Sequence, residues 1–499
     1  MEINKMAETL WNRNAKTFYL LIGASLLLFS FLGARDIWTQ EHRWADIVTA
    51  MFARQDFLHP FLNNAHYYDK PLLSYWLIVI SAKVFGALNT WTLRLPSALA
   101  GLIALASIYQ IGTLLKGKKV GYLAAWLMLT TYYFVFWSRV ASADMLNLAG
   151  TLLALAWYLS KKNKATVFDY SVFFLILAVT SLCKGLIGAI VPLIAVGVDL
   201  CLDRSFKKHL KFSTLLSILP ALIVYLSPFI ASTLITIGNY HENGLYLVYR
   251  ENFLRYFQPF DHRDPIYTYF VYLPIYLLPW TVLFIPALYT YFTKRKFSHP
   301  WIILTLAAIF LFFTFSGSRR SYYVLPMVPF AILFIAEWIL KDGTTSKLFR
   351  MTRALLGISF LFLFIFSIAL PTWFYTEYGV SKFSQLLDQA ISQKWPNQPI
   401  DIVMLDAENK VNFYLRKEDK IIWNERPAYN REHSVGVVLS KHWPQLLAPA
   451  DHTVYVSRKL YATQLQPYFK NYTMIELPVC HWPVICTKQG NNPIAFVPG

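Results

Sequence analysis

Charged residues are scarce in this chain. Only 15% of its 499 residues are Asp, Glu, Lys or Arg, whereas a soluble protein carries about 25%. The scarcity leaves long runs without a charge, and most approach the roughly 20 apolar residues that cross a bilayer as a helix. Hydrophobic residues make up 56% of the chain, and the mean hydropathy is +0.40. The composition therefore excludes an ordinary soluble enzyme and predicts a polytopic α-helical membrane protein.

Cysteine is also scarce, with four residues in the chain. The sequence contains no Cys-x-x-Cys pair, Gly-rich phosphate loop, zinc-protease motif, internal repeat or low-complexity segment. Cys480 and Cys486, in the tail sequence CHWPVIC, are able to form a disulfide if the tail faces an oxidising compartment. The cysteines alone leave that pairing open.

The uncharged runs predict about eleven membrane spans, with thirteen as the upper bound. No small-residue cleavage site follows the first run, so we expect it to be retained. The short run 71–82 ends at Lys83 and fits an interfacial segment better than a span. The predicted spans are 17–34, 95–115, 120–138, 145–160, 168–183, 185–202, 213–238, 266–293, 298–316, 321–340 and 354–375.

Lys and Arg cluster in the short connections between these runs. The clusters lie at 116–119, 161–164, 204–211, 294–296 and 341–353. The positive-inside rule places them in the cytoplasm. We therefore attribute the net charge of +18 to clusters that orient the chain in the membrane, and we expect no nucleic-acid partner. An odd number of spans puts the N-terminus inside and the C-terminus outside.

The chain changes character near residue 376. The β-rich runs PIDIVML, NFYLR, KIIW, SVGVVLS and TVYVS alternate with polar stretches and one helical segment, SKFSQLLDQAISQ. We therefore expect two domains. Residues 1–375 form a transmembrane module with a first outer loop at 35–94, and residues 376–499 form a soluble α/β domain on the outer side.

The outer loops and turns collect basic residues against this topological trend. Lys184 is the clearest case, because an unpaired lysine between two short apolar segments is costly unless an anion meets it. Arg binds phosphate through a planar fork and Lys acts as a point charge. Such cations stabilise a departing phosphate, and a nearby carboxylate is able to deprotonate an acceptor hydroxyl. The pattern indicates glycosyl transfer from a polyprenyl phosphate.

Several segments carry a family resemblance, in the expected order and on the expected side of the membrane. They are TQEHRWADIVTAMF, YYDKPLLSYW, LRLPSALAGL, SADMLNLA, CKGLIGAIVPL, ENFLRYF and SGSRRSYYVLP. Together they resemble the GT-C superfamily of polyprenyl-phosphate-sugar-dependent glycosyltransferases. The resemblance is closest to the lipid A aminoarabinosyltransferase and protein O-mannosyltransferase group. It implies a GT-C fold in a bacterial inner membrane, with the active site and the C-terminal domain on the periplasmic side.

The resemblance also implies roles for individual residues. The family's Asp-Glu-x-Arg-Tyr element falls on 40–44, and its Tyr-x-Glu-Lys-Pro element falls on 67–71. It implies catalytic roles for Glu41, Asp144 and Asp69. It implies that Arg43, Lys70, Lys184, Arg255 and Tyr323 bind the carrier phosphate, and that Gln40, Trp44 and Tyr67 line the substrate pocket.

Two positions depart from the family pattern. Gln40 stands where the family usually has Asp, and an amide is no base, so that role shifts to Glu41 or Asp144. A phosphate acceptor, as in lipid A modification, needs no strong base. The aminoarabinosyltransferase places a divalent metal between a first-loop acid and a fourth-loop His. Here Asn252 stands at the His position. Asp69 and His262 are the other candidate ligands, so the sequence leaves open whether a metal binds.

Other interpretations stay open as well. Glu41 and Arg43 are able to pair with each other, and Asp69 is able to orient Lys70 or cap the following helix. Asp144 lies where a helix dipole favours an acid. A flippase or transporter of a lipid-linked anion predicts charges buried mid-span or repeated halves. A protein O-glycosyltransferase differs from a lipid A enzyme only in its acceptor.

Overall fold

The computed structural model divides the chain into two compact units. The first comprises Met1–Ser30, Tyr68–Leu77 and Arg94–Ile368, and the second comprises Phe31–Tyr67, Ile78–Leu93 and Ala369–Gly499. Helices α3 (Leu73–Val84) and α4 (Thr90–Lys116) contribute to both. The structure describes residues 15–38, 40–62, 65–67, 70–209, 211–235, 246, 249–258, 263–294, 300–341, 346–396, 398, 400–405, 410–414, 452–480 and 491–499.

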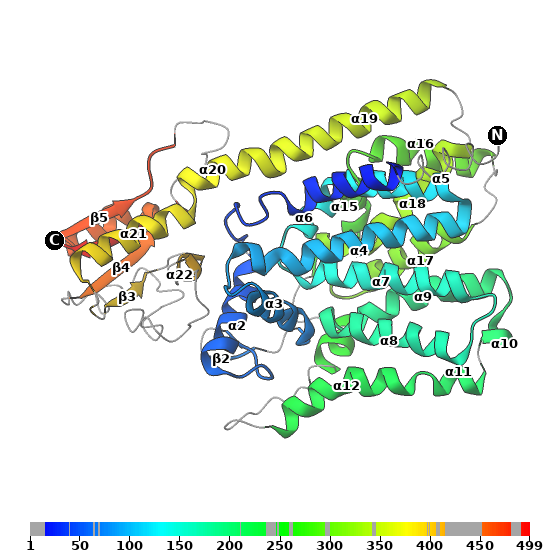
Figure 1. The fold of residues 1–499 in the computed structure, drawn as a ribbon, viewed down its shortest axis with the longest axis horizontal. Helices are drawn as coiled ribbons and strands as arrows, with labels where there is room; N and C mark the ends of the chain where they lie inside the picture. Colours follow the sequence, from blue (N-terminus) through cyan, green and yellow to red (C-terminus); the bar gives the residue numbers. More distant parts are fainter. Residues whose placement is uncertain are drawn as a thin grey trace. The chain divides into compact units, whose positions relative to one another are not determined.

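The first unit is helical (Figure 1). It begins with a helix over Ala15–Phe29 whose last turn is the π-helix η1 (Ser25–Phe29). Its middle part contains α4, α5 (Lys118–Leu129), α6 (Tyr132–Ser138), α7 (Ala143–Lys161), α8 (Val167–Lys184), α9 (Ile187–Leu202), α10 (Phe206–His209), α11 (Phe212–Leu216) and α12 (Leu219–Leu234). Its later part contains η2 (Tyr249–Leu254), α14 (Arg255–Phe257), α15 (Thr268–Tyr276), α16 (Thr281–Lys294), α17 (Trp301–Phe315), η3 (Ser321–Met327), α18 (Val328–Lys341) and α19 (Ser346–Phe364), followed by η4 (Ile365–Ala369).

The polytopic helical fold is confirmed, but fewer helices meet the length of a span than expected. Among the described residues, five are long and apolar enough to cross a membrane, or up to seven if each of two bent pairs is one span. Three of the eleven expected spans correspond to shorter apolar helices, at Ala15–Phe29, Ile187–Leu202 and Trp301–Phe315. The run 71–82, expected to be interfacial, lies mostly in the 12-residue helix α3.

Close helix packing organises the middle of the first unit. Helix α7 packs on α8 and α9, α8 packs on α12, and α18 packs on α5 and α17. Gly150 on α7 allows α8 to approach, because a Cβ there would lie 2.0 Å from the Thr180 hydroxyl oxygen. Every residue of α18 from Val328 to Ile339 is buried. This all-round burial explains why its sequence is apolar apart from Glu337.

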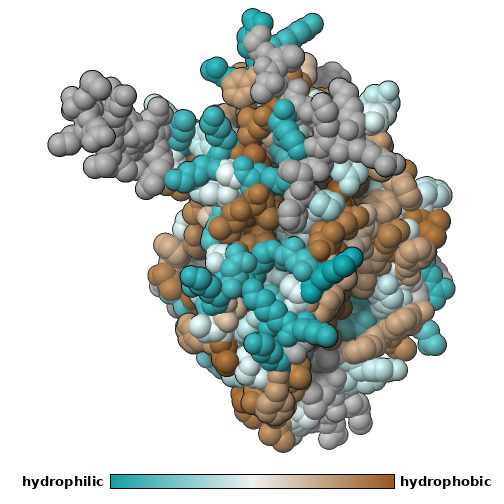
Figure 2. Space-filling model, turned by 90° about the vertical axis from the view of Figure 1, so that its right-hand side faces the viewer, coloured by the Kyte–Doolittle hydropathy of each residue, from teal (hydrophilic) through white to brown (hydrophobic). Residues whose placement is uncertain are grey.

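Ion pairs and helix directions define the two ends of this bundle. At one end Lys116 Nζ lies 2.6 Å from Glu337 Oε1, and Lys162 Nζ lies 2.8 Å from Asp199 Oδ2. Asp144 lies at the opposite end of α7, about 27 Å from Lys162 at 1.5 Å per residue. Figure 2 shows hydrophilic side chains gathered on the face that forms the right-hand side of Figure 1, where α10 lies. The basic connections and Asp144 therefore lie at opposite ends.

The second unit contains a four-stranded sheet with the order β3-β4-β6-β5. Strands β3 (Asp401–Met404) and β4 (Thr453–Arg458) are parallel, whereas β6 (Pro493–Pro498) pairs antiparallel with β4 and with β5 (Tyr472–Glu476). Its other elements are α2 (Glu41–Arg54), β1 (Phe61–Leu62), β2 (Ala65–His66), α20 (Leu370–Tyr378), α21 (Val380–Lys394), α22 (Lys410–Tyr414), η7 (Lys459–Tyr461), α24 (Ala462–Leu465) and η8 (Gln466–Tyr468).

Alternating strand residues build two cores on this sheet. Val454 and Val456 of β4 pack with the apolar side of α21, where Phe383 and Leu387 are fully buried. Tyr455 points to the opposite face and packs in a separate cluster. This period of two is the ordinary pattern of a strand covered on both faces. The expected strands PIDIVML and TVYVS and the expected helix SKFSQLLDQAISQ are therefore confirmed as β3, β4 and α21.

One expected strand is wrong, and other expectations fall outside the described residues. In NFYLR, residues 412–414 belong to the short helix α22, because Val411 and Tyr414, three residues apart, both pack in the core that α21 forms. The runs KIIW and SVGVVLS lie outside the described residues. Cys480 is disulfide-bonded, and its expected partner Cys486 lies outside them. Cys183 and Cys201 are free thiols.

Asp36 joins the start of the first outer loop to the C-terminal part of the second unit. Its Oδ2 accepts a 2.5 Å hydrogen bond from Val380 N, and its Oδ1 accepts one of 3.3 Å from Ser381 N. These are the first amides of α21, whose N-cap residue Gly379 has no side chain to cap them. A Cβ at Gly379 would lie 2.9 Å from the Asp36 carboxylate, so only glycine allows this distant cap.

Candidate functional site

Three of the predicted site residues meet in the first unit. Lys184, the last residue of α8, places its Nζ 2.5 Å from Asp144 Oδ1 and 5.2 Å from the ring centroid of Tyr323. The Lys184 and Asp144 side chains are 14% and 10% exposed. The anion that a lysine at this position requires is therefore Asp144 in this structure. Ser142 caps α7 by accepting a hydrogen bond from Asp144 N, so the Asp144 carboxylate is not the cap of its own helix.

A buried polar layer lies one helical turn inside this pair. Asn147 follows Asp144 by three residues on α7, and Ser181 precedes Lys184 by three residues on α8. Both residues are 1% exposed, and Asn147 Oδ1 and Ser181 Oγ have no hydrogen-bond partner among the residues that the structure describes. Sequence reasoning missed these two residues, although their three-residue spacing from Asp144 and Lys184 was a usable signal. Buried polar atoms without partners are uncommon and mark places where water or a ligand binds.

Arg255 lies beside a carboxylate of its own segment. Its Nη1 donates a hydrogen bond to Glu251 Oε2, and Arg250 Nε donates one of 3.0 Å to Glu251 Oε1. The Glu251 side chain is only 9% exposed. Glu251 therefore accepts hydrogen bonds from two arginines. It orients Arg255 as Asp144 orients Lys184.

Asn252 connects this arginine segment to the end of α8. Its Oδ1 accepts a 2.7 Å hydrogen bond from Leu186 N, two residues after Lys184. Gly185 lies between them at φ +117, and a Cβ there would lie 3.0 Å from Asn252 Oδ1. Asn252 stands where the family resemblance implies a metal-binding histidine, and here its side chain holds the α8–α9 turn. This bond also places the Arg255 segment next to Lys184.

The remaining first-unit candidates are less well defined. Lys70 is half-buried just before α3, whereas Asp69 and His262 lie outside the described residues. Arg319 serves the backbone, because its Nε donates a 2.8 Å hydrogen bond to Asp264 O and its Nη1 donates to Ser316 O. Arg319 thus holds its own loop in place.

The second unit holds the other predicted residues around the start of α2. Arg43 Nη1 donates a 2.9 Å hydrogen bond to the hydroxyl of Tyr67, which follows the β1–β2 hairpin. Trp44 is 6% exposed. Gln40 occupies the N-cap position of α2 and makes no side-chain capping hydrogen bond. The structure therefore brings Arg43 and Tyr67 together in the segment that the family resemblance singles out.

Glu41 has a different environment from the one expected of a base. Its side chain is fully buried, and its Oε2 accepts a 2.6 Å hydrogen bond from Trp38 N and lies 3.7 Å from Arg35 Nη2. The Glu41 carboxylate thus reaches back to the amide three residues earlier, as the acid of a capping box does. This geometry gives Glu41 a role in holding the start of α2.

A histidine pair follows α2 in the first outer loop. His59 Nδ1 lies 2.8 Å from Asp56 Oδ2, and the His59 and His66 rings are 6.3 Å apart. Burial, followed by the nearby His59 and Arg54 charges, lowers the pKa of His66. Among the described residues, no group of three or more His, Cys, Asp or Glu side chains is arranged to hold a metal ion. The possible metal residues Asp69 and His262 lie outside that part of the chain.

Comparisons with known proteins show which proteins the chain resembles as a whole. Residues 69–230 match the profile of the family described as dolichyl-phosphate-mannose-protein mannosyltransferase. The chain is 28% identical over 342 residues to the undecaprenyl phosphate-alpha-4-amino-4-deoxy-L-arabinose arabinosyl transferase of Aeromonas salmonicida. That alignment covers 66% of this chain and 61% of the relative, so the match spans about three fifths of the relative's length. The enzyme of the same name from Yersinia enterocolitica is 26% identical over 365 residues, or 70% of this chain and 64% of the relative.

The fold resembles a solved membrane protein over nearly its whole length. The crystal structure of ArnT from Cupriavidus metallidurans bound to undecaprenyl phosphate aligns with a TM-score of 0.70 at 17% identity, covering 96% of this chain and 97% of that one. The apo structure of the same protein aligns with a TM-score of 0.66. The chain is therefore similar in sequence to aminoarabinosyl transferases, matches the mannosyltransferase family profile over residues 69–230, and shares its fold with the crystal structure of ArnT.

Proposed function

We propose that this protein is a membrane glycosyltransferase that moves a sugar from a polyprenyl-phosphate carrier to an envelope acceptor. The observation that carries the proposal is the buried Lys184–Asp144 pair beside Tyr323, next to the Arg255 segment. Two cations on neighbouring segments, each oriented by an acid, suit the binding of a phosphate. The relative's undecaprenyl-phosphate-linked donor and the solved undecaprenyl phosphate complex support the same donor class.

The proposed orientation follows from the two ends of the helix bundle. The basic connections lie at the end of Lys116 and Lys162, and the positive-inside rule assigns that end to the cytoplasm. Asp144 and Lys184 then face the outer side. The disulfide at Cys480 supports an oxidising compartment for the C-terminal part. The similar transferases come from bacteria. Together with this orientation, they support an inner-membrane enzyme that acts on the periplasmic side.

In the proposed reaction an acceptor oxygen attacks the anomeric carbon of the donor sugar. The bond from that carbon to the carrier phosphate breaks, and its electron pair stays on the departing phosphate oxygen. Lys184 and Arg255 stabilise the negative charge that develops there. Attack from the side opposite the leaving group inverts the anomeric configuration. Asp144 and Glu251 hold the two cations in place before the donor binds.

The residues predicted to be catalytic favour one class of acceptor. Gln40 is unable to accept the proton, and Glu41 is fully buried and engaged with Trp38 N. Asp144 is paired with Lys184. An acceptor phosphate, already ionised, needs no strong base, so this set of residues supports a phosphate group such as that of lipid A. With a hydroxyl acceptor, Asp144 would have to release Lys184 to act as the base.

The test uses the full-length chain in lipid nanodiscs with an undecaprenyl-phosphate-linked sugar and lipid A. We expect Lys184→Ala to lower the transfer rate by about 10²–10³-fold, the usual cost of removing one group that stabilises a developing oxyanion. Lys164→Ala is the matched control, since Lys164 is exposed near the opposite end of α7. Transfer at the wild-type rate by the Lys184→Ala protein would overturn the proposal.

A further inference from the structure

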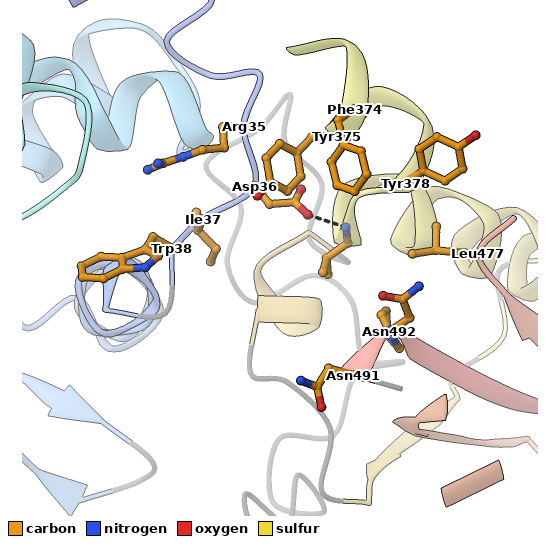
Figure 3. Close-up of a pocket in the computed structure, with 12 residues that line it drawn as sticks. Arg35, Asp36, Ile37, Trp38, Phe374, Tyr375, Tyr378, Leu477, Asn491 and Asn492 are labelled. Atoms are coloured by element: carbon orange, nitrogen blue, oxygen red, sulfur yellow. Dashed lines mark hydrogen bonds between the residues drawn. The ribbon is translucent and has the colours of Figure 1, made fainter. Parts of the chain in front are cut away.

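The second unit contains a cavity that none of the proposed steps uses. Its volume is about 210 Å³, and residues from four stretches of the chain line it. Trp38 comes from the first outer loop, Tyr375 and Tyr378 come from α20, and Asn491 and Asn492 precede β6 (Figure 3). Small-molecule sites usually measure about 300–1,000 Å³, so this cavity suits a group about the size of one sugar ring.

The walls of the cavity differ in chemistry. In Figure 3 the rings of Phe374, Tyr375 and Tyr378 lie together on one side, and Asn491 and Asn492 lie on another. The Phe374 and Tyr378 rings are 5.5 Å apart. Aromatic faces pack against the apolar C–H face of a ring ligand. Each asparagine amide offers two donors and one acceptor oxygen, which match the hydroxyl groups at the ring's edge.

Buried residues hold these walls in position. Val380 and Leu477 are 8% and 4% exposed and belong to the core that α21 forms with the sheet. Asp36 caps α21 at Val380, directly after the aromatic wall on α20. Pro493 is buried at the first position of β6, and a proline restricts the backbone of the residue before it, here Asn492. The cavity is therefore built from ordered elements on each side.

The charges near the cavity are already compensated. The Asp36 carboxylate accepts hydrogen bonds from two amides of α21. The Arg35 guanidinium lies 3.7 Å from the buried carboxylate of Glu41. A phosphate would bring a net negative charge next to these carboxylates. The cavity thus favours a neutral polar ligand over an anion.

We propose that this cavity binds one neutral sugar ring of the glycosyl acceptor. The inference rests on the proposed transferase function, and it makes the acceptor a glycoconjugate rather than an unglycosylated protein. The aromatic wall supplies stacking and the asparagines supply hydrogen bonds to hydroxyl groups. The residues that line this sugar subsite all belong to the second unit, whereas Lys184 belongs to the first.

The first experiment measures sugar binding by saturation-transfer NMR with the full-length protein in nanodiscs. The probes are N-acetylglucosamine, glycerol, which has hydroxyl groups but no ring face, and methyl phosphate, an anion whose methyl protons are observable. We expect a signal from N-acetylglucosamine that falls at least fivefold in Asn492→Ala and is unchanged in Asn471→Ala, a matched asparagine of the same unit outside the cavity. Methyl phosphate and glycerol are expected to give no signal that depends on Asn492. An N-acetylglucosamine signal that Asn492→Ala leaves intact would overturn the proposal.

A second pair of variants tests the aromatic wall without removing a buried side chain. Tyr378 is half-buried, so we expect both variants to fold. Tyr378→Ala is expected to lose the N-acetylglucosamine signal, and Tyr378→Phe is expected to keep it, because the phenyl face remains. Equal binding by both variants would contradict stacking as the mode of recognition.

A kinetic comparison separates this proposal from the transferase function itself. With a lipopolysaccharide that carries neutral core sugars on its lipid A as acceptor, we expect Asn492→Ala to raise the acceptor KM and to leave kcat and undecaprenyl phosphate binding unchanged. A wild-type protein that binds N-acetylglucosamine but transfers no sugar would overturn the proposed function alone. A wild-type protein that transfers sugar at the same acceptor KM as Asn492→Ala would overturn the sugar subsite alone.

Discussion

Asp144 in the first unit and Glu41 in the second are both buried carboxylates in the first turn of a helix, each close to a cation. Their helices use them differently. Ser142 caps α7, so the Asp144 carboxylate serves Lys184. In α2 the N-cap residue Gln40 makes no side-chain capping bond, and Glu41 itself reaches back to Trp38 N. An acid that its own helix does not need is the better candidate for chemistry.

The largest expected effect comes from breaking the first of these pairs. Asp144→Ala leaves Lys184 buried without its acid, and we expect transfer to fall by about 10²-fold. Because the two residues act together, the double variant Asp144→Ala/Lys184→Ala is expected to be no slower than Lys184→Ala alone. The measurement is the initial rate per folded molecule, with folding checked by size-exclusion chromatography. Additive losses would mean that the two residues act independently.

Breaking the second pair is expected to change stability rather than rate. Glu41→Gln keeps an acceptor for Trp38 N but removes the negative charge beside Arg35, which is expected to cost about 1–3 kcal/mol of unfolding free energy. We expect the transfer rate per folded molecule to stay at the wild-type level. Thermal unfolding and initial rates measured on the same preparation separate the two effects. An inactive but fully stable variant would show that Glu41 is a catalytic base.

A smaller effect is expected from the distant cap of α21. Asp36→Ala removes the acceptor for Val380 N and Ser381 N, and the loss of a helix cap costs about 0.5–2 kcal/mol. Hydrogen exchange at these two amides is expected to accelerate, while amides in the middle of α21 change less. Gln385→Ala, at an exposed position on the same helix, is the control. Equal protection in Asp36→Ala and Gln385→Ala would argue against the cap.

The smallest effect is expected at the end of the bundle that carries the basic connections. Lys164 is exposed, and Lys164→Ala is expected to change the free energy of unfolding by less than about 0.5 kcal/mol. Its transfer rate is expected to equal that of the wild type, because the residue lies at the opposite end of α7 from Asp144. A clear loss of transfer in this variant would indicate that the site lies at the Lys164 end of the bundle and not at the Asp144 end.

The sequence predicted the membrane fold well, because scarce charge and apolar runs follow directly from the solvent that the helices meet. It also predicted Lys184 as a cation that requires an anion. It did not identify the partner. Asp144 is forty residues away, and the register that joins them depends on how α7 packs on α8, including the close contact of Gly150 with Thr180.

Contacts between distant segments account for the other gaps. The bond from Leu186 N to Asn252 and the cap that Asp36 places on α21 join residues 66 and 344 positions apart. Local patterns contain no information about such pairs. The predicted strand at NFYLR is wrong for a related reason. Its short apolar pattern fits either a strand or a helical turn, and packing against α21 favours the helical turn.

The most direct test of the central claim measures both products of the reaction. The full-length protein in nanodiscs is given an undecaprenyl-phosphate-linked sugar and lipid A, and mass spectrometry counts the free undecaprenyl phosphate and the glycosylated lipid A. The account predicts that the two products appear in equal amounts, with the transferred sugar inverted, and that both are lost in Lys184→Ala. An intact donor that only changes leaflet, with no undecaprenyl phosphate released, would contradict it and indicate a flippase.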